Sequence, residues 1–168
     1  MKNCYCCGSS EHLIKECPTH KAKVKYRNND AGKWSEDRFT GMLCPICKNG
    51  ILQHAVLHTP SLDFTCLTCG KLFELKSKCL SQQNIPNDIR IIGGQYTHLM
   101  NSILNKNLNL IILIYKVNEK ENLRIERKII IIENNDLKSD LLNNNINIIQ
   151  VKNKSKISIK YIRKYKSY

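Results

Sequence analysis

The stretch of sequence that decides the fold runs Asp63-Phe64-Thr65-Cys66-Leu67-Thr68-Cys69-Gly70-Lys71-Leu72-Phe73-Glu74-Leu75-Lys76. Two cysteines separated by two residues favour a β-hairpin tip that supplies half of a zinc site. The strands that leave this tip carry two carboxylates and a lysine. Phosphodiester hydrolysis can use these three side chains. The two acids can bind a divalent cation, and the lysine ammonium can hold the attacking water in place.

The predicted hairpin places these polar side chains on one face. With the turn centred between Leu67 and Thr68, Asp63 lies opposite Leu72, and side chains then alternate between the two faces. Diagonal neighbours on one face lie about 7–8 Å apart, which lets two carboxylates grip one ion. A solvated face is the alternative for such a strand, and a bulge at Gly70 would shift the register. The predicted polar face holds Asp63, Thr65, Glu74 and Lys76, and the apolar face holds Leu62, Phe64, Phe73 and Leu75.

Length and charge narrow the class of protein. The 168 residues suffice for one domain with a small appendage. A net charge of +13 favours a polyanionic partner, nucleic acid ahead of an anionic membrane. The longest apolar runs, at 110–115 and 129–132, fall short of the roughly 20 residues that a membrane-spanning helix needs. The N-terminus has no apolar signal-peptide core, so we expect a soluble, intracellular protein.

The cysteines indicate metal binding more than disulfides, because the chain shows no export signal. The first group follows the pattern Cys4-x2-Cys7-x4-His12-x4-Cys17, and its gaps match those of the retroviral-type zinc knuckle. Four ligands so closely spaced can fold a peptide too small to have a core. Knuckles stack single-stranded bases on exposed side chains, and Tyr5 and Leu13 hold the matching positions. A purely structural or protein-binding finger is the alternative.

The second group, Cys44-x2-Cys47-x18-Cys66-x2-Cys69, has the spacing of a zinc ribbon. Four thiolates close the tetrahedral site and leave no position for substrate. We therefore expect this zinc to staple the hairpin and not to be the reaction centre. Cys6 and Cys79 are left over: Cys6 lies next to a knuckle ligand and could compete with it, and Cys79 is expected to be a packed thiol.

The chain divides into a knuckle at residues 1–18, a basic linker at 19–30 and a main domain at 31–168. In the main domain, periodicity and turn residues predict a mixed α/β layer. The basic, aromatic run at 160–168 reads more readily as a frayed tail than as a nucleic-acid clamp. The predicted elements are a short helix from Ser35-Glu36-Asp37, strands at 51–57, 108–117, 123–132, 146–151 and 157–162, a loop at 80–94, and helices at 96–104 and 136–142.

The segment from Ala31 to Ile149 resembles the catalytic domain of the DpnI-like restriction endonucleases, which belong to the PD-(D/E)xK superfamily. The resemblance rests mainly on the hairpin, where the cysteine pair, the two acids and the lysine occur at fixed spacings from one another. The resemblance implies a restriction-endonuclease-like α/β fold, whose mixed-sheet core carries the Cys4 zinc ribbon as an insertion. The other matching pieces are Ser35-Glu36-Asp37, Cys44-Pro45-x-Cys47, Gly94-Gln95-Tyr96 with Met100, and Asn109 and Tyr115 at the two ends of the apolar strand.

The resemblance also implies roles for individual residues. Asp63 and Glu74 would bind Mg²⁺, helped by the backbone carbonyl of Leu75. Lys76 would orient the attacking water or help to deprotonate it. The leading interpretation is therefore a magnesium-dependent endodeoxyribonuclease with two structural zinc ions. The alternative is a non-catalytic, zinc-dependent nucleic-acid-binding accessory protein, or a structural partner within a larger complex.

Members of this family cut a short site when its adenine is methylated, and they read it with a C-terminal winged-helix domain. Residues 31–168 leave no room for such a domain, and the arginine-bearing loop is reduced to Asn143-Asn144-Asn145. We expect the knuckle to take over DNA binding, which shifts the preference toward single-stranded, branched or nonspecific DNA. The target site and the oligomeric state stay open.

Overall fold

The structure is a computed structural model that describes residues 30–55, 59, 62–118, 121 and 123–168. It separates into two units, Met1–Asp37 and Arg38–Tyr168. Residues 30–39 are helical, and the Ser35 hydroxyl donates a 2.7 Å hydrogen bond to the Ala31 carbonyl one turn earlier. Ser35 therefore lies inside the helix, and the prediction that the helix starts there is wrong. The predicted knuckle and most of the predicted linker lie outside the described residues.

A mixed six-stranded sheet forms the centre of the second unit, as predicted. Its strands lie in the order β1-β2-β3-β5-β6-β9. β3 and β5 pair in parallel, while the other neighbours are antiparallel. The six strands are β1 (Leu52–His54), β2 (Phe64–Cys66), β3 (Leu72–Cys79), β5 (Asn109–Asn118), β6 (Leu123–Ile132) and β9 (Lys166–Ser167).

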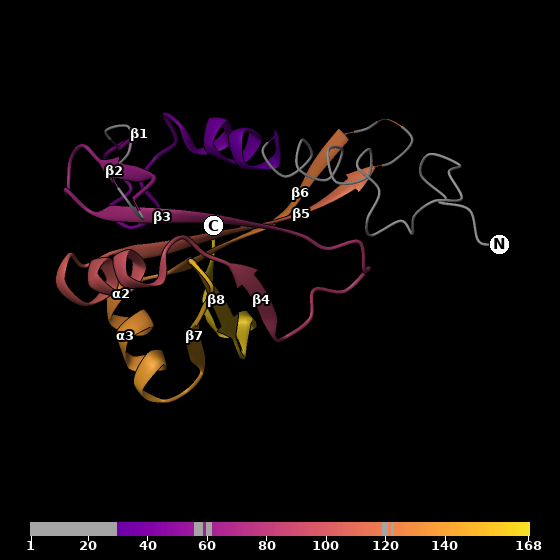
Figure 1. Ribbon diagram of the computed structural model, residues 1–168. Helices are drawn as coiled ribbons and strands as arrows, with labels where there is room; N and C mark the ends of the chain where they lie inside the picture. The colour runs from indigo at the N-terminus through magenta and orange to yellow at the C-terminus, as the bar shows by residue number, and fades with distance from the viewer. Residues whose placement is uncertain (1–29, 56–58, 60–61, 119–120, 122) are drawn as a thin grey trace, which may run out of the picture. The chain divides into compact units, whose positions relative to one another are not determined.

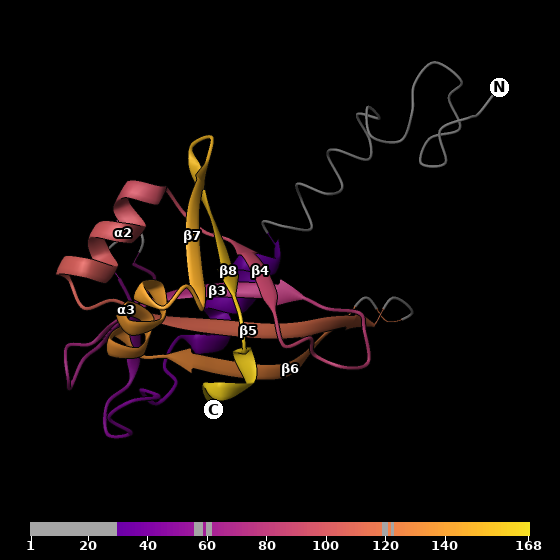
Figure 2. The same ribbon diagram turned by 90° about the horizontal axis from the view of Figure 1, so that it is seen from below.

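A second layer covers one face of this sheet. It consists of the helices α2 (Tyr96–Asn105) and α3 (Asn134–Leu142) and of a small antiparallel sheet in the order β4-β8-β7. Figures 1 and 2 show the helices and the small sheet on the same side of β3, β5 and β6. The strands of the small sheet are β4 (Ile89–Ile92), β7 (Ile146–Val151) and β8 (Lys154–Ile159).

The core lies between these two layers. Leu110, Ile112 and Ile114 of β5 pack in one buried cluster with apolar side chains of α2, α3 and the small sheet. The intervening residues Ile111 and Leu113 are buried on the opposite face. β5 is thus covered on both faces, which explains its nearly continuous apolar sequence.

Most of the predicted elements are confirmed, and a few differ in type or in bounds. β5, β6, β7 and α2 lie within a residue or so of their predicted positions. The predicted loop at 80–94 contains β4, which forms only because it pairs with β8. The predicted strand at 157–162 begins earlier, at Lys154, and its end turns into a 3-10 helix at Ile162–Lys164. α3 begins at Asn134 with Glu133 as its N-cap, so Asp136 is not the cap.

The C-terminal run is not a frayed tail. Ile162 and Tyr165 are buried, and β9 pairs with β6. The backbone N–H of Tyr168 donates to the Ile129 carbonyl at 3.1 Å, and the Lys48 ammonium lies 4.1 Å from the centre of the Tyr168 ring. Buried apolar side chains and strand pairing therefore hold this run in place, which its charge pattern does not predict.

Candidate active site and metal centre

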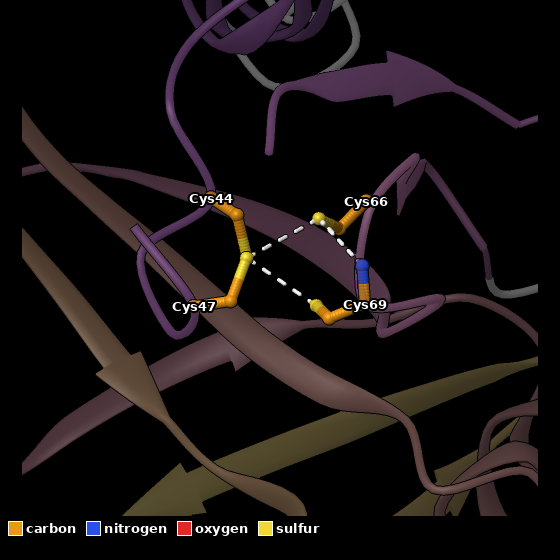
Figure 3. A group of neighbouring side chains, drawn as sticks. All are labelled: Cys44, Cys47, Cys66 and Cys69. Atoms are coloured by element: carbon orange, nitrogen blue, oxygen red, sulfur yellow. Dashed lines mark hydrogen bonds between the residues drawn. The ribbon is translucent and has the colours of Figure 1, made fainter. Parts of the chain in front are cut away.

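Four cysteines meet between the Cys44–Cys47 turn and the tip of the β2–β3 hairpin. Figure 3 shows their side chains pointing toward one another. The sulfur atoms of Cys44, Cys47, Cys66 and Cys69 all lie within 4.8 Å of one another. The Cys44–Cys69 pair is 3.9 Å apart and the Cys47–Cys66 pair 3.6 Å apart.

This spacing fits a tetrahedral zinc ion. Zn–S bonds of about 2.3 Å at tetrahedral angles put the sulfur atoms roughly 3.8 Å apart. Burial raises the pKa of the Cys44 thiol to about 12, while hydrogen bonds led by the Asn49 backbone lower the pKa of Cys47 to about 6. Zinc binding replaces the thiol protons, so both groups would bind as thiolates. The predicted ribbon residues are therefore brought together, and they could hold zinc.

Close backbone packing shapes this centre. A Cβ on Gly50 would lie 2.5 Å from the Thr68 hydroxyl and 2.7 Å from the Cys66 sulfur. The Gly50 carbonyl also accepts a 2.6 Å hydrogen bond from the Cys44 N–H. Only glycine lets the two cysteine turns approach this closely. Spacing of the cysteines alone did not identify Gly50.

The hairpin register differs from the prediction by two residues. Phe64 pairs with Phe73 and Thr65 with Leu72, so the turn is centred between Thr68 and Cys69. Because side chains alternate with period two, a shift of two residues changes no face. The regular pairing ends at Phe64: the Asp63 N–H donates a 3.0 Å bond to the Phe73 carbonyl, although Phe73 already lies opposite Phe64, so Asp63 sits at an irregularity of the hairpin.

The three predicted catalytic side chains meet on β3. The Asp63 carboxylate accepts a 2.6 Å hydrogen bond from the Leu75 N–H. Glu74, the residue directly before Leu75, forms an ion pair with the Lys76 ammonium. The Glu74 side chain is 3% exposed and that of Lys76 is 17% exposed. Two carboxylates and an ammonium are thus held along three consecutive residues of one strand.

The second layer accounts for the burial of Glu74. In the parallel pairing of β3 and β5, Glu74 lies beside Leu110 and Lys76 beside Ile112. Paired residues share a face of the sheet, so the ion pair lies on the same face as the apolar core. A buried carboxylate needs a compensating cation, which Lys76 supplies here.

The family model described as "DpnI: Dam-replacing family" matches residues 19–163. The chain belongs to this family. DpnI-family proteins are restriction-endonuclease-like, and membership implies a nuclease whose substrate is DNA. A comparison with the curated proteins gave no match. Within the described part of the chain, no helix is long and apolar enough to cross a membrane.

Two buried asparagines hold this DpnI-family site in place, and only one had a sequence signal. The Asn109 amide donates to the Leu72 carbonyl at 2.9 Å and accepts from the Asn134 N–H at 3.0 Å. The Asn134 amide donates to the Ile103 and Leu108 carbonyls. This network ties the start of β3 to β5, α2 and α3. Asn109 was noted at the end of the apolar strand, whereas Asn134 was not identified.

An arginine from β6 holds the loop that leaves β3. The Arg127 guanidinium donates to the carbonyls of Leu80 and Gln82, at 3.1 and 2.5 Å, and also to that of Gln83. Nothing in the local sequence around Arg127 predicts this contact. Cys79, which ends β3, is exposed, so the prediction of a packed thiol is wrong.

Proposed function

We propose that this DpnI-family protein is a magnesium-dependent endodeoxyribonuclease whose catalytic residues are Asp63, Glu74 and Lys76. One observation carries the proposal: the Asp63 carboxylate bonds to the backbone directly beside a buried Glu74–Lys76 ion pair. A protein that only bound nucleic acid would need none of these three residues. In such a protein, burying the Glu74 carboxylate would lower stability without serving the function.

The donor set suits Mg²⁺. Magnesium prefers oxygen ligands and is commonly held by one or two carboxylates together with substrate phosphate. Asp63 and Glu74 would supply carboxylate oxygens. The Leu75 carbonyl would supply a third oxygen, because it leaves β3 on the same edge as the N–H that Asp63 accepts. A bound Mg²⁺ would polarise the phosphate and offset its growing charge.

The residues of the chain have separate roles in this proposal. The Leu75 N–H orients the Asp63 carboxylate, and Glu74 holds the Lys76 ammonium in place. Lys76 orients the attacking water and stabilises the negative charge that gathers on the phosphate oxygens. Water attacks the phosphorus and releases a proton to the solvent, the bond to the leaving sugar oxygen breaks, and that oxygen takes up a proton from solvent water. The product is a cut DNA backbone.

Two zinc modules complete the proposal. The sulfur spacing supports a structural zinc at Cys44, Cys47, Cys66 and Cys69. A second zinc, held by Cys4, Cys7, His12 and Cys17, stays a prediction from spacing, as does the division into a knuckle at 1–18, a linker at 19–30 and a nuclease domain at 31–168. Tyr5 and Leu13 would stack bases of single-stranded DNA. Weaker single-strand binding by Tyr5→Ala in a gel-shift assay would support that role.

A plasmid assay tests the proposed activity. Supercoiled plasmid, adenine-methylated or unmethylated, is incubated with the protein and Mg²⁺, and nicked and linear products are measured. We expect cleavage by the wild type and a loss of at least about a hundredfold in Lys76→Ala. Lys78→Ala is the matched control, since Lys78 lies on the same strand and face. Cleavage confined to methylated plasmid would make the enzyme methyl-adenine-directed.

Two outcomes would contradict the proposal. Cleavage that persists in Lys76→Ala would place the reaction elsewhere. Binding without any cleavage, unchanged in Lys76→Ala, would assign the accessory role instead.

A further inference from the structure

The outer face of the small sheet has no partner in the described structure. Ile89 and Ile91 of β4 point into the core together with Ile157 and Ile159 of β8, so the intervening residues point outward. The register places the outward residues in cross-strand rows. These rows are Arg90–Ser158–Asn147, Ile92–Lys156–Ile149 and Lys154–Val151.

This face combines cations with exposed apolar side chains. Ile92 is 69% exposed, Ile149 45% and Val151 47%. Lys154 and Arg90 are also exposed, and no carboxylate occurs in the three rows. Of the cations in segment 141–168, Lys164 and Lys166 pair with Asp140 and Glu133, whereas Lys154 and Lys156 lie in the rows of this face. The face is therefore complementary in charge to a polyanion.

The two strands β7 and β8 form a hairpin that reaches beyond the body of the unit. Figure 2 shows this hairpin running across the strands of the large sheet, with its free end past β3 on the side away from β5. Its turn follows Val151, and Lys152 adopts a left-handed conformation with φ 57°. The hairpin thus extends past β3, the strand to which Glu74 and Lys76 belong.

We propose that the outer face of β4-β8-β7, with the β7–β8 hairpin, binds duplex DNA and seats the hairpin in the major groove. The major groove is wide enough for a two-stranded β-ribbon. Lys154, Lys156 and Arg90 contact backbone phosphates, while Ile149 and Val151 face the floor of the groove. This proposal rests on the proposed function, because it assigns the surface that presents the substrate of the same site.

The lysines also explain why DNA is favoured over a second copy of the chain. Two copies of this face would bring lysines against lysines, and like charges in an interface are unfavourable. The duplex supplies a phosphate charge about every 1.7 Å of its axis, which suits a face with cations in successive rows.

A binding assay without magnesium tests the surface independently of cleavage. The full-length protein is titrated into a fluorescein-labelled duplex of about 20 base pairs, and anisotropy is measured over a range of salt concentrations. The test variant is Lys154→Gln/Lys156→Gln. The matched control is Lys116→Gln/Lys138→Gln, which removes the same charge from β5 and α3.

We expect the hairpin variant to bind about tenfold more weakly, and the slope of log K against log salt to fall by about 1.8, the value for two lost phosphate contacts. The control should keep both the affinity and the slope of the wild type. A duplex in which uracil replaces thymine, and which therefore lacks the C5-methyl groups on the floor of the major groove, should bind the wild type more weakly.

Three results would overturn the proposal. Equal weakening in both variants would show that only net charge matters. Unchanged binding in the hairpin variant would place the DNA elsewhere. Sedimentation that shows a wild-type dimer, converted to a monomer by Ile149→Ser, would assign the face to a second copy. If the plasmid is not cut but the hairpin variant still loses affinity, the proposed function fails and the binding surface stands.

Discussion

The Glu74–Lys76 pair is the residue-scale feature on which the site depends. Glu74 is almost completely buried, and its charge is balanced by an ammonium two residues along the same strand. Breaking a buried pair by removing one partner commonly costs about 3–5 kcal/mol, because the other charge is left without compensation. A divalent cation would replace part of that compensation. If the proposed Mg²⁺ binds here, the pair would therefore link stability to metal binding.

Replacing the lysine alone tests this link. In magnesium-free buffer we expect Lys76→Met to lower the free energy of unfolding by about 2–4 kcal/mol, because the buried Glu74 carboxylate loses the ammonium that balances its charge. Mg²⁺ should recover a measurable part of that loss and should stabilise the variant more than the wild type. Urea unfolding with and without Mg²⁺ measures both effects.

The double variant Glu74→Gln/Lys76→Met is the control for this cycle, since it removes both charges. It should be more stable than Lys76→Met alone. A single variant as stable as the wild type would show that the pair contributes nothing to folding.

Gly50 gives a second residue-scale prediction. Gly50→Ala forces a Cβ to within 2.7 Å of the Cys66 sulfur, so one cysteine turn must move away from the other. We expect the variant to bind zinc less tightly and to melt several degrees lower, since about 1 kcal/mol corresponds to roughly 2–4 °C in a chain of this size. Competition with a zinc chelator and a thermal melt measure the two effects. Gly32→Ala, whose Cβ meets nothing within 4 Å, should leave zinc binding unchanged and should not lower the melting temperature, since alanine is more favourable than glycine in a helix.

At the scale of elements, the sequence predicts what local patterns determine. The apolar run of β5 and the helical spacing of Leu99 and Ile103 in α2 identified both elements correctly. β4 was missed because its four residues become a strand only by pairing with β8, about 65 positions later. The hairpin turn was misplaced by one residue, yet the faces of the paired residues were correct because alternation is local.

The C-terminal element is held by a buried carboxylate that no local pattern shows. Asp140 near the end of α3 accepts hydrogen bonds from the Lys164 ammonium, from the Tyr165 hydroxyl and, at 3.0 Å, from the Asn145 amide. Burial by itself raises the pKa of Asp140, but these hydrogen bonds outweigh it, and the pKa is lowered. Burial and the neighbouring Asp140 raise the pKa of Tyr165, so its hydroxyl stays a donor.

A lowered pKa makes this contribution to stability dependent on pH. The carboxylate contributes fully above its unfolded value near 4, and the contribution is lost as pH falls through the lowered pKa of the folded state. Asp140→Asn should therefore be less stable than the wild type by about 1–3 kcal/mol at pH 7, and the difference should shrink below about pH 4. Urea unfolding at several pH values measures this difference. Asn135→Ala, an exposed change on the same helix that alters no charge, should keep the pH dependence of the wild type.

At the scale of the whole molecule, the mixed-sheet fold and the family could be predicted from the sequence, because the zinc pair and the acid/acid/lysine set occupy one short hairpin. The site residues Asp63, Glu74 and Lys76 were chosen from alternation and resemblance alone. Their supports could not be predicted in this way. Asn134 and Arg127 act through contacts that span 26 to 47 positions, and Asn134 also reaches Ile103. Only the tertiary structure brings such partners together.

The proposed nuclease depends on a divalent ion bound between Asp63 and Glu74, beside a hairpin that four thiolates would hold on zinc. Crystals soaked in Mn²⁺, an anomalous scatterer that takes the same oxygen ligands as Mg²⁺, test it directly. We expect an anomalous peak within about 2.5 Å of both carboxylates and of the Leu75 carbonyl, and no such peak in Asp63→Asn. Manganese bound only elsewhere, or carboxylates too far apart to share one ion, would contradict it.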